Sequence, residues 1–178
     1  MTIVDLENRV AGSATRREMR ARRLPHRATY VLVFNSRGEL FVQRRTASKD
    51  VYPSHDDVAA GGVVLAGEEY DEGAAREVEE ELGVRGVPLV PHLDFYHEDG
   101  GNRVWGRVYS CVTDAPLTLQ EEEVESGRFL PLADVLAAAE TSPFTPDGLE
   151  ALRRYLEVRS EGAPPGAEPP GGGRPTPG

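Results

Sequence analysis

The chain has 178 residues, of which 39% are hydrophobic and 28% are charged, and its formal net charge at pH 7 is -10. This length and composition are typical of a soluble globular protein of about one domain with a substantial core. The net negative charge argues against a general nucleic-acid-binding protein, and the single cysteine, Cys111, excludes an intrachain disulfide. The sequence has no long apolar run and no signal-peptide pattern, which indicates a cytoplasmic protein without a membrane partner.

Residues 1–24 are expected to form an N-terminal arm. Apolar residues alternate from Ile3 to Leu6 and a turn follows at Glu7-Asn8, which predicts a small hairpin or an edge strand. An arginine-rich run, Arg16 to Arg23, comes next. Such a run is most often a solvated arm, and the rarer alternative is a basic patch that steers an anionic substrate, so we assign it no site residues.

Two strands, Ala28 to Phe34 and Leu40 to Gln43, are predicted next, joined by a hairpin turn at residues 35–38. Three basic residues follow the second strand: Arg44, Arg45 and Lys49. They are either a polar strand end or a clamp for phosphate oxygens, and the second interpretation makes them the predicted substrate-binding residues.

A small apolar segment, Val58 to Val64, predicts a buried strand, and a helix is expected from about Glu69 to Leu82 with Gly83 as its C-terminal cap. At about 100° per residue, the helix has two contrasting faces. The expected packing face holds Ala75, Val78 and Leu82, and the nearly opposite face holds Glu77, Glu80 and Glu81.

The three glutamates repel one another unless a positive charge lies among them. An acidic helix face is most often a solvated surface, but a divalent cation would also satisfy this stripe. Mg²⁺ favours carboxylate oxygens and commonly completes its shell with waters and substrate phosphates. The stripe is therefore a candidate seat for a metal ion and a diphosphate together.

The remaining elements suggest an α+β sandwich. Strands are predicted at Val87 to Tyr96, at Arg103 to Val112, and after an acidic loop in a segment ending at Leu130. Helices are predicted at Pro131 to Ala139 and at Pro146 to Val158. The tail, residues 159–178, is expected to be disordered, because twelve of the eighteen residues from Glu161 to Gly178 are proline or glycine.

The spacing from Gly62 to Val84 resembles the Nudix box, G-x5-E-x7-R-E-U-x-E-E-x-G-U, at every specified position. The resemblance implies a Nudix hydrolase domain over residues 25–158, with an α/β/α sandwich, a mixed β-sheet and the box helix. It also implies Mg²⁺, with Mn²⁺ as a substitute, held by Glu77, Glu80, Glu81 and the carbonyl of Gly61. Arg76 would orient Glu77 or Glu68, and Glu80 or Glu123 would be the general base. The structural box residues would be Gly62, Glu68 and Gly83.

Within this superfamily the chain resembles a YfcD-like branch near type I isopentenyl diphosphate isomerases. The residues that carry this likeness are those at 25–28, 42–49 and 123–124. It raises a rival function, but such isomerases need a cysteine and a histidine before the box, and residues 57–62 contain neither. Their box also tends to be degraded, whereas this one is complete. Both departures favour hydrolysis of a diphosphate linkage, NDP-X to NMP plus P-X.

A non-catalytic module that senses a nucleotide is a third hypothesis, which the intact box glutamates disfavour. The box does not specify the group attached to the diphosphate, so nucleotides and prenyl or sugar diphosphates all stay open as small-molecule substrates. His26 is interpreted as a structural histidine rather than a metal ligand. A monomer or a homodimer is expected.

Overall fold

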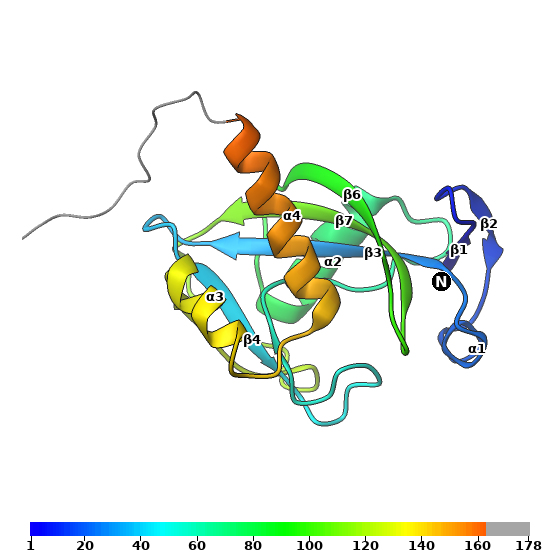
Figure 1. Ribbon diagram of the computed structural model, residues 1–178, viewed down its shortest axis with the longest axis horizontal. Helices are drawn as coiled ribbons and strands as arrows, with labels where there is room; N and C mark the ends of the chain where they lie inside the picture. The colour runs from blue at the N-terminus through cyan, green and yellow to red at the C-terminus, as the bar shows by residue number, and fades with distance from the viewer. Residues whose placement is uncertain (163–178) are drawn as a thin grey trace, which may run out of the picture.

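The computed structural model describes residues 1–162, which form a mixed eight-stranded sheet with helices on both faces (Figure 1). The strands are β1 (Thr2–Val4), β2 (Val10–Ser13), β3 (His26–Phe34), β4 (Leu40–Arg45), β5 (Asp56–Asp57), β6 (Val90–Glu98), β7 (Arg103–Val112) and β8 (Val124–Leu130). The helices are α1 (Arg16–Arg22), α2 (Tyr70–Leu82), α3 (Leu132–Ala139) and α4 (Pro146–Gly162). The predicted α+β sandwich is therefore confirmed.

Strand β3 lies at the centre of the molecule and is covered on both faces. Its side chains alternate between two apolar clusters, because successive residues of a strand point to opposite sides. Tyr30, Leu32 and Phe34 belong to the cluster beneath α3 and α4, whereas Val31 and Val33 belong to the cluster beneath α2. A strand buried on both faces reads as a continuous apolar run, which is how this strand was predictable.

The sheet opens between β3 and β4, and this opening positions the site. The two strands pair only next to their hairpin, at Phe34 and Leu40, whereas β3 pairs with β7 in parallel along its whole length. Residues 58–64 fill the opening. They form isolated bridges to β3, with Val31 N–H donating to Ala60 O at 2.7 Å and Thr29 N–H donating to Gly62 O at 2.9 Å. The regular strand predicted there is thus an irregular, buried segment.

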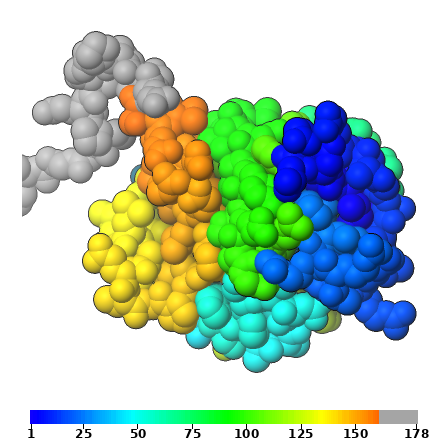
Figure 2. All heavy atoms as spheres, turned by 45° about the vertical axis from the view of Figure 1, so that its right-hand side comes forward, coloured from blue at the N-terminus to red at the C-terminus, as the bar shows by residue number. Residues whose placement is uncertain are grey.

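The N-terminal arm is part of the packed molecule. The expected hairpin forms between β1 and β2, and β1 also pairs with β3. The helix α1 was not predicted. Thr15 caps it by accepting the N–H of Glu18 at 3.2 Å, and Met19 is its one buried residue. In Figure 2 these N-terminal residues (blue) lie beside the β6–β7 strands (green).

The C-terminal helix α4 extends to Gly162, beyond the expected end at Val158. The first residues of the predicted disordered tail are therefore helical, and the rest of that tail lies outside the described residues. Within the described part, no helix is both long enough and apolar enough to cross a membrane.

Candidate active site

Helix α2 begins and ends close to the predicted residues. Glu69 precedes it as the N-cap, and a capping box joins Glu69 and Glu72, each side chain accepting a backbone N–H of the other. Gly83 ends the helix in the left-handed conformation, with φ 69°, which glycine adopts without steric cost. The helix and its cap are confirmed.

The predicted faces of α2 need correction. Ala75 is exposed, and the fully buried Ala74 packs in the apolar cluster with Val78 and Leu82. The buried surface of the helix is wider than its apolar face, because residues 58–64 also cover the side chains next to that face. Glu77 and Glu81 are among these side chains and are 8% and 1% exposed. Only Glu80 of the three glutamates has an exposed side chain, at 52%.

Two glycines let the backbone of residues 58–64 approach the buried glutamates. A Cβ on Gly62 would lie 2.7 Å from Oε1 of Glu77, and a Cβ on Gly61 would lie 2.0 Å from the carbonyl oxygen of Thr29. A side chain at Gly62 would displace the Glu77 carboxylate, and one at Gly61 would overlap the backbone of β3. Gly61 also has φ 155°, which residues with a side chain rarely adopt.

Glu81 is the most enclosed acid of the site. Its Oε2 accepts hydrogen bonds from Gly61 N–H at 3.1 Å and from Gln43 Nε2 at 3.2 Å. The Lys49 ammonium lies 3.9 Å from Oε1. Burial raises the pKa of Glu81 to about 8, although the charge of Lys49 acts in the opposite direction. This carboxyl group is therefore surrounded by Gly61, Gln43 and Lys49 rather than by solvent.

Arg76 connects the other acids of the box. Its Nε lies 2.8 Å from Glu68, and one terminal nitrogen lies 2.7 Å from Glu77 and 3.2 Å from Glu80. The expected pairing of Arg76 with Glu68 and Glu77 is present. The ordinary Glu72–Arg76 helix pair is not formed, because Glu72 is engaged in the capping box. Burial raises the pKa of Glu77, and the hydrogen bond from Arg76 partly offsets it.

The donor set suits Mg²⁺, but the acids do not form a ready-made cluster. Among residues 1–162, no three carboxylate, imidazole or thiolate side chains converge as a metal site would require. Arg76 and Lys49 supply the positive charge that relieves the repulsion, a role that the sequence assigned to a metal alone. Carboxylate oxygens and a glycine carbonyl beside an open groove still fit a hard cation.

A groove of about 320 Å³ runs past these acids. Glu77, Glu80 and Arg76 line one side of it, and Lys49 and Glu123 line another. Lys49 forms an ion pair with Glu123. Burial raises the pKa of Glu123, but this pair outweighs that effect, and the net direction is downward. The structure therefore brings Glu123 and Lys49 to the box helix as predicted from sequence.

The two arginines at the end of β4 diverge. Arg45 faces the groove, and its guanidinium lies 3.3 Å from Asp57 and donates to Val51 O at 3.0 Å. Arg44 points to the other side, pairs with Asp56 at 3.2 Å and does not line this groove. The prediction that Arg44 binds the substrate is thus not supported, because adjacent strand residues face opposite sides.

Helix α1 contributes basic side chains that the sequence analysis left without a role. Arg16 and Arg20 line the same groove as Glu77 and Glu80 of the box helix. Their i, i+4 spacing places both on one helix face, which is the signal in the sequence that identifies them once the run is helical.

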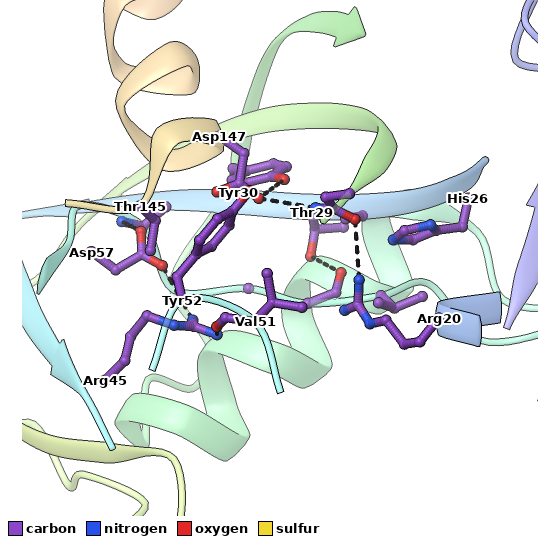
Figure 3. Close-up of a pocket in the computed structure, with 16 residues that line it drawn as sticks. Arg20, His26, Thr29, Tyr30, Arg45, Val51, Tyr52, Asp57, Thr145 and Asp147 are labelled. Carbon is purple, nitrogen blue, oxygen red and sulfur yellow. Dashed lines mark hydrogen bonds and ion pairs between the residues drawn. The ribbon is translucent and has the colours of Figure 1, made fainter. Parts of the chain in front are cut away.

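A deeper polar cavity adjoins the groove and shares Arg45, Gly61 and Gly62 with it (Figure 3). Asp57 and Asp147 line its inner part. Burial raises the pKa of Asp57 to about 6, against the opposing charge of Arg45. These residues lack any local motif, and only the fold brings them together.

His26 lies at the edge of this cavity as a buried structural residue. Its Nδ1 is 3.0 Å from the carbonyl oxygen of Leu24, so it donates a hydrogen bond in the neutral ring. Burial lowers the pKa of His26 to about 4. Cys111 is buried in the cluster beneath α2, and burial raises its pKa to about 11.

Comparisons with known proteins agree with this geometry. The NUDIX domain family matches residues 24–155. An uncharacterized Nudix hydrolase of Pseudomonas aeruginosa is 52% identical over 155 residues, covering 87% of this chain and 92% of that protein. The uncharacterized Nudix hydrolase YfcD of Escherichia coli K12 is 47% identical over 155 residues, covering 87% and 85%.

Solved structures share the fold. DR0079 from Deinococcus radiodurans aligns with a TM-score of 0.74 and 28% identity, covering 86% of this chain and 96% of that one. The Nudix domain of Shewanella oneidensis NrtR, solved with ADP ribose, aligns with a TM-score of 0.57 and 18% identity, covering 80% and 99%. The second likeness is one of fold alone.

Proposed function

The chain belongs to the Nudix hydrolases, which act on pyrophosphate bonds, and from this premise we propose that it is a Mg²⁺-dependent enzyme that converts NDP-X to NMP and P-X. The substrate is a nucleotide or a related small-molecule diphosphate. Mn²⁺ would substitute for Mg²⁺. A cytoplasmic location and a monomeric or homodimeric state stay predictions of the sequence.

One observation carries the proposal. Glu77 lines a groove that Arg45, Lys49 and Arg76 also line, and the buried Glu81 accepts the N–H of Gly61 beside it. Buried like charges are costly in a protein unless they have a partner, and sites that tolerate them are commonly functional. Arg76 and Lys49 offset part of this charge, and a cation bound together with an anionic substrate would offset the rest.

The residues divide into metal-holding and phosphate-binding sets. Glu77, Glu80, Glu81 and the Gly61 carbonyl would hold Mg²⁺, which would neutralise phosphate charge and lower the pKa of a bound water. Lys49 and Arg45 line the groove and would donate hydrogen bonds to phosphate oxygens. Arg76 fixes Glu77 through the 2.7 Å ion pair and is a positioning residue.

The reaction needs a carboxylate that accepts the proton of the attacking water. The water oxygen forms a bond to phosphorus, the bridging P–O bond breaks, and the leaving phosphoryl group departs with the electron pair. Glu80 and Glu123 both line the groove and are the candidates. Both are in ion pairs, and Glu80 is favoured because its side chain is the more exposed, at 52% against 37% for Glu123.

The rival functions have less support. An isomerase of the related type needs a reactive thiol, and Cys111 is buried in the apolar cluster beneath α2, with a raised pKa. A nucleotide-sensing module, as suggested by the neighbour solved with ADP ribose, would not need the complete set of box glutamates. Hydrolysis uses all of them.

The test is a screen with Mg²⁺ over nucleotide and non-nucleotide diphosphates that separates and quantifies the monophosphate products, NMP and P-X. We expect turnover of at least one compound, loss of turnover with a chelator, and a decrease of about 10²- to 10⁴-fold in Glu80→Gln and in Glu81→Gln. Glu79→Gln is the matched control, since Glu79 lies on the same helix and pairs with Arg85 instead. Isomerisation of isopentenyl diphosphate, or full activity in Glu81→Gln, would contradict the proposal.

A further inference from the structure

We propose that the polar cavity beside the groove binds the group attached to the diphosphate, and that it selects a compact group rich in hydrogen-bond donors. This inference rests on the proposed function, because it assumes that a diphosphate lies in the groove. It adds the chemical class of the attached group, which the box does not specify.

The cavity is placed to receive one end of a groove-bound ligand. Arg20, Arg45, Gly61 and Gly62 line both spaces, so they form one continuous path. The basic residues stand where the two spaces join, while the inner part holds Asp57 and Asp147 (Figure 3). A ligand with phosphate at one end and hydrogen-bond donors at the other matches this order of charges.

The inner end offers acceptors with spare capacity. Asp147 Oδ2 accepts from Tyr30 OH at 2.8 Å and from Asn102 Nδ2 at 3.3 Å, and its Oδ1 accepts from Gly148 N–H at 3.0 Å. Asp57 accepts from Ala59 N–H at 3.2 Å and from Arg45 at 3.3 Å. A carboxylate has about four acceptor positions, so each of these two can accept further hydrogen bonds. A hydroxyl or amino group of a ligand would supply them.

Thr145 is an independent indication of a missing partner. Its side chain lines the cavity, the residue is 1% exposed, and its Oγ1 lies near Asp57, whose pKa it lowers, but makes no hydrogen bond of good geometry within residues 1–162. A Cβ on Gly148 would lie 2.4 Å from this oxygen and 2.5 Å from Asp57 Oδ1, so both oxygens approach the same glycine. Buried hydroxyls are normally paired, and a ligand polar group is the partner that we infer.

The size and polarity of the cavity limit which chemical group attached to the diphosphate can bind there. The cavity volume is about 80 Å³, and one water needs roughly 10–15 Å³ of such space, so a ring or a few polar atoms fit but a long chain does not. A hydrocarbon group would displace the water around Asp57 and Asp147 without forming hydrogen bonds to them. A second anionic group would be repelled. Hydroxyls of a sugar and an amino-bearing base remain as the two sources of donors.

The test measures binding without turnover, using methylene-bridged diphosphate analogues with Mg²⁺ and isothermal titration. The probes are the analogues of cytidine diphosphate, uridine diphosphate, glucosyl diphosphate and isopentenyl diphosphate. We expect one donor-rich analogue to bind at least about tenfold more tightly than the isopentenyl analogue. Comparing cytidine with uridine isolates the amino group, and the glucosyl analogue isolates the hydroxyls.

Variants then locate the contact. Thr145→Val keeps the side-chain shape, removes the hydroxyl and should weaken the donor-rich analogue about tenfold, while Thr145→Ser restores affinity. Thr141→Val, at an exposed threonine, is the matched control. Asp147→Asn is the second variant if Thr145→Val does not fold, and it should weaken the same analogue without weakening the isopentenyl analogue.

The outcomes separate this inference from the proposed function. Preferential binding of the isopentenyl analogue, or an equal loss for all analogues in Thr145→Val and Asp147→Asn, would overturn the cavity assignment. Selective binding of a donor-rich analogue without hydrolysis of its natural diphosphate would support the cavity and overturn the hydrolase proposal instead.

Discussion

The buried side chain of His26 makes the stability of this protein depend on pH in the acid range. His26 is 3% exposed, and burial lowers its pKa from 6.5 to about 4. The folded protein therefore keeps this imidazole neutral over a pH range in which an unfolded chain would protonate it. Such a group destabilises the fold as the pH falls, because the unfolded state binds more protons.

We predict that His26 reduces the free energy of unfolding as the pH drops from 6.5 towards 4, by at most about 3 kcal/mol. The loss begins below the unfolded pKa and is complete below the folded one. Urea unfolding at several pH values, in the parent protein and in His26→Gln, measures it. The difference between the two proteins isolates His26 from other titrating groups, and a difference that does not vary with pH would refute the prediction.

The structural role of His26 was predictable, whereas the burial of Glu77 and Glu81 was not. Helical spacing alone puts the glutamates opposite Ala75 and Val78, and that geometry contains no information on what covers the helix. The irregular segment at residues 58–64 covers them, and its glycines permit the contact. The spacing of the box residues identified the acids, but the packing decided how enclosed each one is.

At the scale of the element, the orientation of α2 is testable with two adjacent alanines. Ala74 is fully buried in the cluster with Val78 and Leu82, whereas Ala75 is exposed. We predict that Ala74→Leu costs about 1–3 kcal/mol of stability through overpacking, and that Ala75→Leu changes stability by less than about 0.5 kcal/mol. Thermal or urea unfolding compares them. The reverse order would mean that the sequence-based face, with Ala75 packed, is the correct one.

Elements with their own start and stop signals could be predicted closely. Helix α2 has Glu69 and Gly83 at its ends, and β7 has the predicted bounds, Arg103–Val112. Helix α1 has a start signal, Thr15 with Glu18 three residues later, but its one buried residue, Met19, gives no apolar periodicity. The cavity was beyond sequence reasoning for another reason: Asp57, Asn102 and Asp147 come from three distant segments that only the sheet topology brings together.

At the scale of the whole molecule, charge is unevenly distributed. The chain carries a net charge of -10, yet four basic residues outside the box helix line the groove, among them Arg16 and Arg20 from α1. An anionic substrate is therefore repelled by the protein as a whole and attracted locally. Local attraction of this kind raises the rate of association and is screened by salt.

We predict that Arg16→Gln lowers kcat/KM roughly two- to fivefold at low ionic strength, mainly through a higher KM, and that added salt removes the difference. Arg44→Gln is the matched control, since it deletes one arginine that faces away from the groove. Steady-state kinetics on a hydrolysed diphosphate at about 20 mM and about 500 mM salt give the comparison, because the screening length is long at the lower concentration and short at the higher one. Equal losses in the two variants would contradict a steering role for α1.

The position of α1 has a consequence for how substrate choice could diversify. This seven-residue helix precedes the part of the chain that the family as a whole shares, residues 24–155, and it commits only Met19 to the interior. Its solvent-facing positions can be exchanged without loosening the sheet or displacing the acids of the box. Substitutions on the solvent-facing side of α1 could thus change substrate selectivity, while the residues of the hydrolytic site stay the same.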